Sequence, residues 1–328
     1  MGVYIVTGAA GFIGSNVTEK LHSAGHTVVG IDSLNNAYEV RLKEWRLSQL
    51  SSLQNFYFYK CDITNKDALL KIVESTKQQF VTIDAIIHLA AYAGVRLSVE
   101  KPWLYCDTNI SGTLNILESC RFGEIHKVVV ASSSSLYGTK NEVPFKESAN
   151  TDSPVSPYAA TKKAAEALCY SYHHLHGIDC SLLRFFTVYG PAGRPDMSVY
   201  RFVKWIYEEQ PLTLYGDGEQ SRDFTYVSDI ADGVIKSLKD VGFEVFNLGS
   251  DSPVKMVDLI ASIESIVGKK ASVKVFPSHS ADVEKTWADI DKARSMLGWS
   301  PETILSVGLK KTVDWYVQNR DWVTKLSV

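Results

Sequence analysis

The stretch VYIVTGAAGFIGSNVTEKLHSAGHTVVGID, residues 3–32, decides the fold. An apolar run precedes a glycine loop, a helical stretch and a second apolar run, which is the order of a strand, a turn, a helix and a parallel strand. Gly8, Gly11 and Gly14 follow in G-x-x-G-x-x-G spacing, and Asp32 closes the second strand. Glycines in such a turn let backbone amides and the helix N-terminus approach a pyrophosphate.

Asp32 indicates which dinucleotide the loop binds. A carboxylate there accepts hydrogen bonds from the adenosine ribose hydroxyls and repels a 2'-phosphate, which favours NAD over NADP. A structural turn without a nucleotide would show similar glycines, but the strand, the helix and the acid are all in register. The expected NAD-binding residues of this unit are Gly8, Gly11, Phe12, Ile13, Gly14 and Asp32.

The rest of the chain extends this pattern. The apolar runs FYFYKCD, AIIHLAA, KVVVASS and CSLLRFF alternate with helical stretches up to about residue 190, which predicts an α/β fold with a Rossmann-type doubly wound parallel sheet. Beyond Gly190 the rhythm is irregular and rich in proline, which indicates a smaller mixed α/β lobe. We expect an NAD-binding domain over residues 1–188, with a return segment around 225–250, and a substrate domain over 189–328.

Composition narrows the class of protein. The 328 residues are 45% hydrophobic with a formal net charge of −3, so neither nucleic acid nor an anionic membrane is an expected partner. Five scattered cysteines without a CxxC pair indicate reduced thiols, and no metal site is expected. An apolar strand starts at Val3 and no apolar run of membrane-spanning length occurs. We therefore expect a cytoplasmic protein.

Tyr158 and Lys162 form a candidate catalytic pair in SPYAATKKAAEAL. Ser156 is a probable N-cap and Pro157 suits the first helical position, which places both side chains on one face near the helix start. An unperturbed tyrosine has a pKa near 10, and a neighbouring ammonium together with an oxidised nicotinamide would favour its phenolate. The alternative is a chance Y-x-x-x-K on a helix surface, with the tyrosine packed and the lysine solvated.

Together, TGAAGFIG, Asp32, the strand end ASSSSLYG (131–138) and YAATK resemble the extended short-chain dehydrogenase/reductase family over essentially the whole chain. The resemblance implies a catalytic triad of Ser133, Tyr158 and Lys162 and a mainly structural Asn109. It implies a homodimer formed through the helices that contain Asn109 and Tyr158. The further NAD-binding residues that we expect are Asp62, Ile63, Leu89, Ala90 and Ala91, in addition to Tyr158 and Lys162. The alternative for Asp62 is a turn-forming aspartate.

Within this family, epimerisation at carbon 4, dehydration, decarboxylation and reduction compete. Dehydratases resemble one another in an Asp-Glu pair after the catalytic residue and decarboxylating relatives carry a Glu there, whereas this chain has Ser134 and Ser135. The strings LRFFTVYGP, GRPDMSVYRF and SRDFTYVSDI resemble UDP-glucuronate 4-epimerases. The resemblance implies a UDP-sugar substrate bound by Arg96, Ser133, Ser134, Ser135, Tyr158, Thr187, Arg194 and Arg222.

The expected reaction is NAD-dependent epimerisation of UDP-glucuronate to UDP-galacturonate through a transient 4-keto sugar, without decarboxylation. A UDP-glucose or UDP-N-acetylglucosamine 4-epimerase is the nearest alternative, because GDGEQSRDF is shared with broader epimerase groups. A non-catalytic NAD-sensing protein is a more distant one. Such proteins usually lose the tyrosine or the lysine, and both are present here.

Overall fold

The central sheet of the protein matches the predicted α/β fold. The computed structural model describes residues 1–277 and 283–327. Across these residues seven strands form one parallel sheet in the order β10-β6-β5-β4-β1-β2-β3. The strands are β1 (Val3–Thr7), β2 (Thr27–Asp32), β3 (Phe56–Lys60), β4 (Ala85–His88), β5 (Lys127–Ser133), β6 (Asp179–Phe185) and β10 (Phe243–Leu248). The chain runs outward from β1 to β3 and then crosses over to β4, which confirms the doubly wound Rossmann-type sheet.

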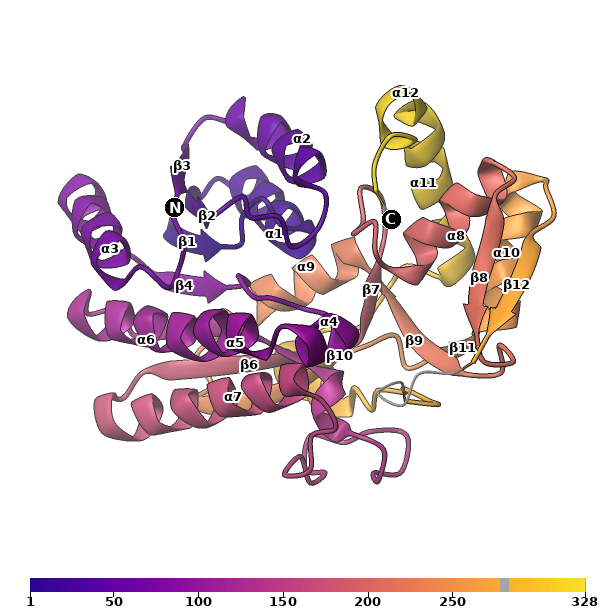
Figure 1. Ribbon diagram of the computed structural model, residues 1–328. Helices are drawn as coiled ribbons and strands as arrows, with labels where there is room; N and C mark the ends of the chain where they lie inside the picture. Colours follow the sequence, from indigo (N-terminus) through magenta and orange to yellow (C-terminus); the bar gives the residue numbers. More distant parts are fainter. Residues whose placement is uncertain (278–282, 328) are drawn as a thin grey trace.

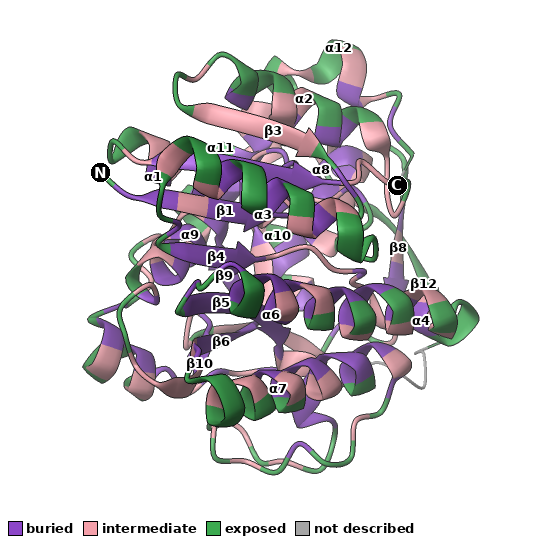
Figure 2. Cartoon of the chain, turned by 90° about the vertical axis from the view of Figure 1, so that its left-hand side faces the viewer, coloured by how far each residue is buried: buried purple, intermediate pink, exposed green. Residues whose placement is uncertain are grey.

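Helices cover both faces of this sheet (Figures 1 and 2). On one face lie α3 (Lys66–Phe80), α6 (Gly112–Phe122) and α7 (Pro157–His176), whose apolar residues form one buried cluster with the strands. On the other face lie α1 (Phe12–Ser23) and α9 (Val227–Lys236), and α2 (Val40–Ser51) packs beside α1. The strands are buried on both faces, which explains why they appear in the sequence as continuous apolar runs.

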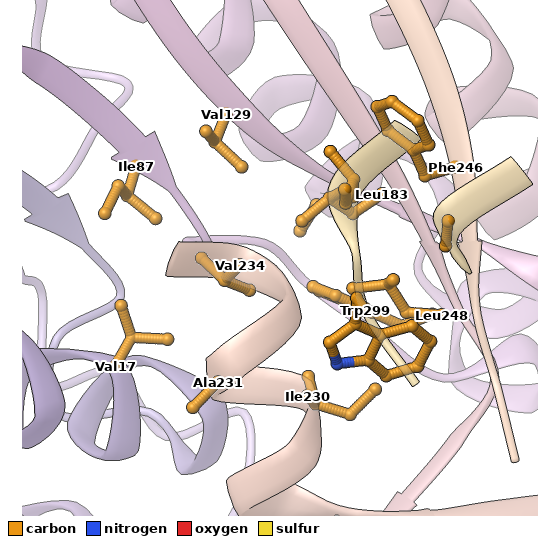
Figure 3. Packing of buried hydrophobic residues seen from close by; sticks show 14 of the residues in the cluster. Val17, Ile87, Val129, Leu183, Ile230, Ala231, Val234, Phe246, Leu248 and Trp299 are labelled. Atoms are coloured by element: carbon orange, nitrogen blue, oxygen red, sulfur yellow. The ribbon is translucent and has the colours of Figure 1, made fainter. Parts of the chain in front are cut away.

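Figure 3 shows how side chains pack between the main sheet and the helices α1 and α9. Ile230, Ala231 and Val234 of α9 lie between Val17 of α1 and the strand residues, and the buried Trp299 closes the end of this cluster. The Trp299 indole donates a hydrogen bond to the Asp229 carbonyl oxygen at 2.8 Å. The chain therefore comes back to the main sheet with α9 and β10 after it has entered the smaller lobe.

The smaller lobe has its own apolar core, built by residues of α8, α10 and α11 with the short strands. Its elements are β7 (Thr187–Tyr189), α8 (Ser198–Tyr207), β8 (Pro211–Tyr215), β9 (Ser221–Tyr226), β11 (Pro253–Lys255), α10 (Met256–Val267), β12 (Ser272–Phe276), α11 (Leu305–Gln318) and α12 (Arg320–Val323). A π-helical turn (Ala293–Leu297) packs instead with the apolar cluster of the main sheet. Two small sheets, β11-β9-β7 and β12-β8, complete it. The predicted mixed α/β composition of this lobe is confirmed.

Three further observations bear on the sequence-based expectations. Within the described ranges, no helix has the length and apolar character needed to cross a membrane. All five cysteines are free thiols. The described chain likewise contains no group of three or more His, Cys, Asp and Glu side chains placed to hold a metal ion.

His88, at the end of β4, is a buried neutral imidazole. Its Nδ1 lies 2.8 Å from Thr7 Oγ1 and its Nε2 lies 3.1 Å from Thr113 Oγ1. Burial, together with the smaller effect of the positive charge of Lys162, lowers the pKa of His88 to about 3. Because an unfolded histidine titrates near pH 6.5, the unfolded chain binds more protons than the folded one between these values.

Stability is therefore expected to fall as the pH drops below 6.5. Between pH 6.5 and 4.5 the His88 contribution corresponds to a loss of about 2 to 3 kcal/mol in the free energy of unfolding. Urea denaturation of the wild type and of His88→Gln, followed across this range, measures it, because the amide keeps hydrogen-bonding capacity but does not titrate. Parallel pH dependences in the two proteins would refute the assignment.

Candidate active site

The glycine loop between β1 and α1 is closed too tightly for side chains. Gly8 has a φ of +72°, and a Cβ there would lie 2.8 Å from the Ala90 backbone nitrogen. A Cβ on Gly11 would lie 2.8 Å from the Gly8 carbonyl oxygen, and one on Gly14 would lie only 2.0 Å from the same atom. Each glycine is therefore needed for the loop to fold back on itself and bring the start of α1 against the strand.

Asp32, at the end of β2, is tied to this loop. Its carboxylate accepts hydrogen bonds from the Ala10 amide at 3.1 Å and from the Leu34 amide at 2.8 Å, and the residue is 7% exposed. A cavity of about 650 Å³ opens beside it at the carboxyl ends of β1, β2 and β4. The lining includes the predicted residues Gly8, Gly11, Asp32, Asp62, Ile63, Leu89, Ala90 and Ala91.

Other predicted cofactor residues lie beneath or beside this cavity. Phe12 and Gly14 are buried at the start of α1, and Ile13 packs against the core. The Asp62 carboxylate accepts hydrogen bonds from the Thr64 amide at 2.9 Å and the Thr64 hydroxyl at 2.8 Å. Asp62 thus forms a turn with Thr64, and it also lies in the cavity wall.

Lys43 and Asn35 are cavity residues that the sequence analysis did not single out. Lys43, on α2, is 5% exposed, and its Nζ donates to Asn35 Oδ1 at 2.7 Å. Burial lowers the pKa of Lys43 to about 8, with the charge of Asp32 acting in the opposite direction. The polar run after Asp32, SLNNAY, was the available signal, but it became meaningful only once α2 had folded against the loop.

The serine segment stands at the carboxyl end of β5. Ser133 ends the strand with an extended backbone, and Ser134–Tyr137 form a 3-10 turn. Ser133 Oγ accepts a hydrogen bond from the Ser135 amide at 3.2 Å and lies 3.1 Å from Ser135 Oγ. The segment is a structured strand end, as predicted, and not a loose linker.

Tyr158 and Lys162 are both buried on one face of the first turns of α7. The helix starts as predicted, because Ser156 Oγ accepts a hydrogen bond from the Ala159 amide at 3.2 Å and Pro157 occupies the first turn. Lys162 Nζ donates to the Ala131 carbonyl oxygen of β5 at 2.9 Å. A hydrogen bond links Tyr158 to Ser133, so these three side chains meet where β5 and α7 come together.

Burial has the largest effect on the pKa values of this pair in the protein alone. Burial raises the pKa of Tyr158, while the hydrogen bond with Ser133 and the charge of Arg194 lower it. Burial also lowers the pKa of Lys162 to about 8, with the charges of Cys169 and Glu166 opposing this. The sequence analysis assigned the lowering of the Tyr158 pKa to Lys162 and an oxidised nicotinamide, but the protein's own groups give the opposite net direction because desolvation outweighs them.

Asn109 has the structural role that was expected. It lies in the π-helical turn Cys106–Ser111, which follows α4 (Val95–Glu100) and α5 (Pro102–Tyr105). Its Oδ1 accepts from the Tyr92 amide at 2.9 Å, and its Nδ2 donates to the Tyr92 carbonyl oxygen at 3.0 Å and to Thr161 Oγ1 at 3.0 Å. Asn109 therefore connects the loop after β4 to the catalytic helix α7.

A second, larger cleft of about 1440 Å³ lies between the sheet edge and the smaller lobe. Four of the predicted substrate residues line it: Arg96, Thr187, Arg194 and Arg222. Ser133, Ser134, Ser135 and Tyr158 lie outside the lining of this cleft as far as the described chain defines it. Additional lining residues that the sequence analysis missed are Asp196, Arg201, Tyr215 and Gln220.

Arg194 connects the two cavities, because it lines both. Its guanidinium donates to the Ala93 carbonyl oxygen at 3.2 Å and pairs with Asp196 at 2.6 Å. Arg96 stacks over the Tyr215 ring at 4.1 Å, so a cation and an aromatic face stand together in the cleft wall. The two cavities therefore share part of their wall, and the second one carries groups suited to an anion.

A parallel sheet with a glycine loop, an acid after its second strand and a buried Ser-Tyr-Lys constellation at the strand ends defines a dinucleotide-binding α/β enzyme. Residues 4–249 match the sequence profile of the NAD dependent epimerase/dehydratase family. The chain belongs to this family.

Several relatives are similar to this chain over nearly its whole length. The chain is 52% identical over 329 residues to the UDP-glucuronate 4-epimerase of Thermodesulfobacterium geofontis, covering 100% of both chains. It is 40% identical to UDP-glucuronate 4-epimerase 1 of Arabidopsis thaliana, covering 99% of this chain and 79% of the relative. The crystal structure of UDP-glucuronic acid 4-epimerase from Bacillus cereus with UDP-glucuronic acid and NAD superimposes with a TM-score of 0.90 at 38% identity, covering 97% and 99% of the two chains.

Proposed function

We propose that the protein interconverts UDP-glucuronate and UDP-galacturonate by NAD-dependent epimerisation at carbon 4, without decarboxylation. The observation that carries this proposal is that Arg194 lines both the glycine-loop cavity and a neighbouring cleft with three further arginines, Arg96, Arg201 and Arg222. The 52% identity to a UDP-glucuronate 4-epimerase over the full length supports the same substrate.

The first cavity suits NAD. The glycine loop fits a pyrophosphate because its three glycines let the backbone pack closely. Asp32 lies in the cavity wall, where its carboxylate would accept a hydrogen bond from a ribose hydroxyl. We assign NAD binding to Gly8, Gly11, Asp32, Asp62, Ile63, Leu89, Ala90 and Ala91, with Phe12, Ile13 and Gly14 supporting the loop and Tyr158 and Lys162 facing the reaction centre. When bound, NAD supplies the acceptor and then the donor of a hydride at carbon 4 of the sugar.

The proton chemistry falls to Ser133, Tyr158 and Lys162. Tyr158, in its phenolate form, removes the proton of the carbon 4 hydroxyl, and it returns a proton to the same oxygen when the 4-keto sugar is reduced on its opposite face. Ser133 hydrogen-bonds to Tyr158 and so lowers the pKa that burial raises. Lys162, anchored on the Ala131 carbonyl oxygen, keeps a positive charge behind this site below pH 8, since its own pKa is about 8.

Epimerisation requires the 4-keto sugar to present both faces in turn. Arg194 and Arg222 are suited to hold the diphosphate while the sugar turns, because a guanidinium donates to phosphate in pairs. The keto uronate is a β-keto acid, and Ser134, Ser135 and Thr187 would bind its carboxylate through hydroxyl groups alone. Neutral donors fix this carboxylate without adding a base that promotes elimination or loss of carbon dioxide.

The purified protein is expected to convert UDP-glucuronate into UDP-galacturonate without added NAD, as followed by proton NMR. Parallel assays contain UDP-glucose or UDP-N-acetylglucosamine at the same concentration, since 4-epimerases of these two sugars are the nearest alternative functions. Turnover of a neutral sugar with none of the uronate would refute the proposal. A UDP-pentose product would instead show that the hydroxyl donors do not prevent decarboxylation.

We further infer how the chain divides into two domains. The NAD-binding domain would comprise residues 1–188 with the return segment around 225–250, and the UDP-sugar domain residues 189–328. The return of α9 and β10 to the main sheet supports this division. The free thiols of the five cysteines support a reducing compartment, and we propose the cytoplasm.

We also propose that α6 and α7 form a homodimer interface. These neighbouring helices (Figure 1) expose large apolar side chains, with Phe122 56%, Tyr170 57% and Leu175 68% exposed. Trp103 of α5, on the adjoining surface, is 79% exposed. Exposed apolar side chains of this size are often covered by a partner.

Sedimentation velocity tests this interface. Tyr170→Arg is expected to shift the protein from dimer to monomer, because it places a charge within the apolar surface. Val307→Arg, at an exposed apolar position on α11 in the other lobe, is the matched control and should leave the sedimentation coefficient unchanged. A wild-type protein that sediments as a monomer at micromolar concentration would contradict the proposal.

A further inference from the structure

Ser132 is the one residue of the four-serine run that has no assigned role in the reaction. It is 4% exposed and points away from the cleft, toward the helix layer. Its Oγ donates to Glu166 Oε1 at 2.6 Å. Glu166 lies on α7 four residues after Lys162, so the catalytic helix carries Tyr158, Lys162 and Glu166 along one buried face.

Glu166 is paired with Arg184 of β6 inside the protein. Arg184 Nε donates to Glu166 Oε1 at 3.0 Å and Nη2 donates to Oε2 at 2.8 Å, which is a two-pronged contact with fixed geometry. The two side chains are only 5% and 9% exposed. Such a pair is a weak source of net stability, because desolvation offsets the attraction, but it fixes one arrangement of the groups around it.

Arg184 also reaches the other end of the serine segment. Its Nη1 donates to the Tyr137 hydroxyl at 3.0 Å, and that hydroxyl donates to Asn247 Oδ1 of β10 at 2.6 Å. Burial raises the pKa of Tyr137 to about 12, so its proton remains in place for this bond. The ion pair therefore contacts Ser132, immediately before the catalytic serine, and Tyr137, the last residue of the 3-10 turn.

We propose that the Glu166–Arg184 pair is a clamp that positions residues 133–136 against the catalytic helix by holding both ends of this segment. Glu166, Arg184, Ser132 and Tyr137 are positioning residues, which act on the reaction through Ser133 and Tyr158. The bond from Lys162 Nζ to the Ala131 carbonyl oxygen adds a third connection between the same strand and the same helix.

The clamp has a functional consequence because the reacting groups come from different elements. Ser133 belongs to β5 and Tyr158 to α7, and their hydrogen bond persists only while strand end and helix keep one relative position. A displacement of about 1 Å at a catalytic group can cost on the order of 100-fold in rate. The diphosphate-binding arginines and the glycine loop lie on other elements and do not depend on the clamp.

Two conservative variants release the segment while leaving the ion pair intact: Ser132→Ala and Tyr137→Phe. Each is expected to reduce kcat for UDP-glucuronate by about tenfold or more, and the double variant by more than either. The dissociation constants for UDP and NAD, measured by calorimetry, should remain within twofold of wild type. Unchanged kcat in the folded double variant, or losses of UDP and NAD affinity that parallel the loss of kcat, would overturn the clamp.

Glu166→Gln tests the charge of the clamp, with Glu118→Gln as its matched control. Glu118 also pairs with an arginine, Arg121, and accepts a bond from Tyr172 at the far end of α7. Glu166→Gln should lower kcat and leave UDP affinity intact, whereas Glu118→Gln should leave kcat unchanged. Equal effects of both substitutions on kcat would count against the clamp. If Glu166→Gln does not fold, the kcat values of Ser132→Ala and Tyr137→Phe decide whether the clamp exists.

The inference rests on the proposed roles of Ser133 and Tyr158, so Tyr158→Phe is assayed in parallel. If Tyr158→Phe retains activity, the proposed chemistry itself fails. If Tyr158→Phe is inactive while the Ser132 and Tyr137 variants match wild type, only the clamp fails.

Discussion

Tyr158→Phe is expected to lower kcat for UDP-glucuronate by about 10²- to 10⁴-fold, the range associated with a positioned proton-transfer group. The substitution removes one hydroxyl and with it the hydrogen bond to Ser133. The aromatic ring, which packs edge-on against Tyr105 with centroids 6.1 Å apart, stays in place. Folding and cofactor content should therefore remain unchanged, so the loss reports on the proton transfer.

The measurement is steady-state turnover by NMR together with NAD content after denaturation. Tyr172→Phe is the matched control, because it removes a tyrosine hydroxyl from the same helix at a site where the partner is Glu118. This control should retain wild-type kcat. A Tyr158→Phe protein with more than a tenth of wild-type kcat would exclude Tyr158 as the general base.

Gly14→Ala is expected to weaken NAD binding by about 100-fold or more. The added Cβ would stand 2.0 Å from the Gly8 carbonyl oxygen and 3.1 Å from the Ala9 Cα, so the obstructing atoms are backbone and cannot rotate aside. Relief requires α1 to move away from the loop, which separates the amides from the pyrophosphate position. Overpacking of this kind typically costs about 1–3 kcal/mol or more, on top of the lost ligand contacts.

Calorimetric titration with NAD measures this effect. Ser23→Ala, at the exposed end of the same helix, is the control and should bind NAD like wild type. The thermal unfolding temperature without ligand is recorded for both variants to separate general destabilisation from loss of the site. An unchanged dissociation constant in Gly14→Ala would show that the loop can reshape without cost.

The fold was predictable largely because the main sheet is parallel and buried. Its first six strands appear as short β-branched or apolar runs, and periodicity in the helices between them is clear. The seventh strand, β10, was foreseen only as part of a return segment around residues 225–250. FEVFNL is half-buried over its first residues and resembles many edge segments, so its pairing with β6 depends on where α9 packs.

The site was predictable where chemistry follows from local spacing. Tyr158 and Lys162 share a helix face because they are four residues apart, and Asp32 is recognisable as the last residue of its strand. Lys43 and Arg201 were missed because each lines its cavity only through the packing of α2 or α8 against another part of the chain. The rise in the pKa of Tyr158 that burial causes was missed for a related reason, since burial of the ring is a tertiary property.

Arg194 lines both cavities, and this shared wall makes cofactor and substrate thermodynamically linked. A guanidinium that touches both sites interacts differently with each ligand when the other is present. Any gain that UDP causes in the binding free energy of NAD then equals the gain that NAD causes in the binding free energy of UDP. Saturation with UDP should then tighten NAD by the same factor by which NAD tightens UDP. An enzyme that must reuse one cofactor at every turnover benefits from such reciprocity, because each bound sugar nucleotide slows the escape of NAD.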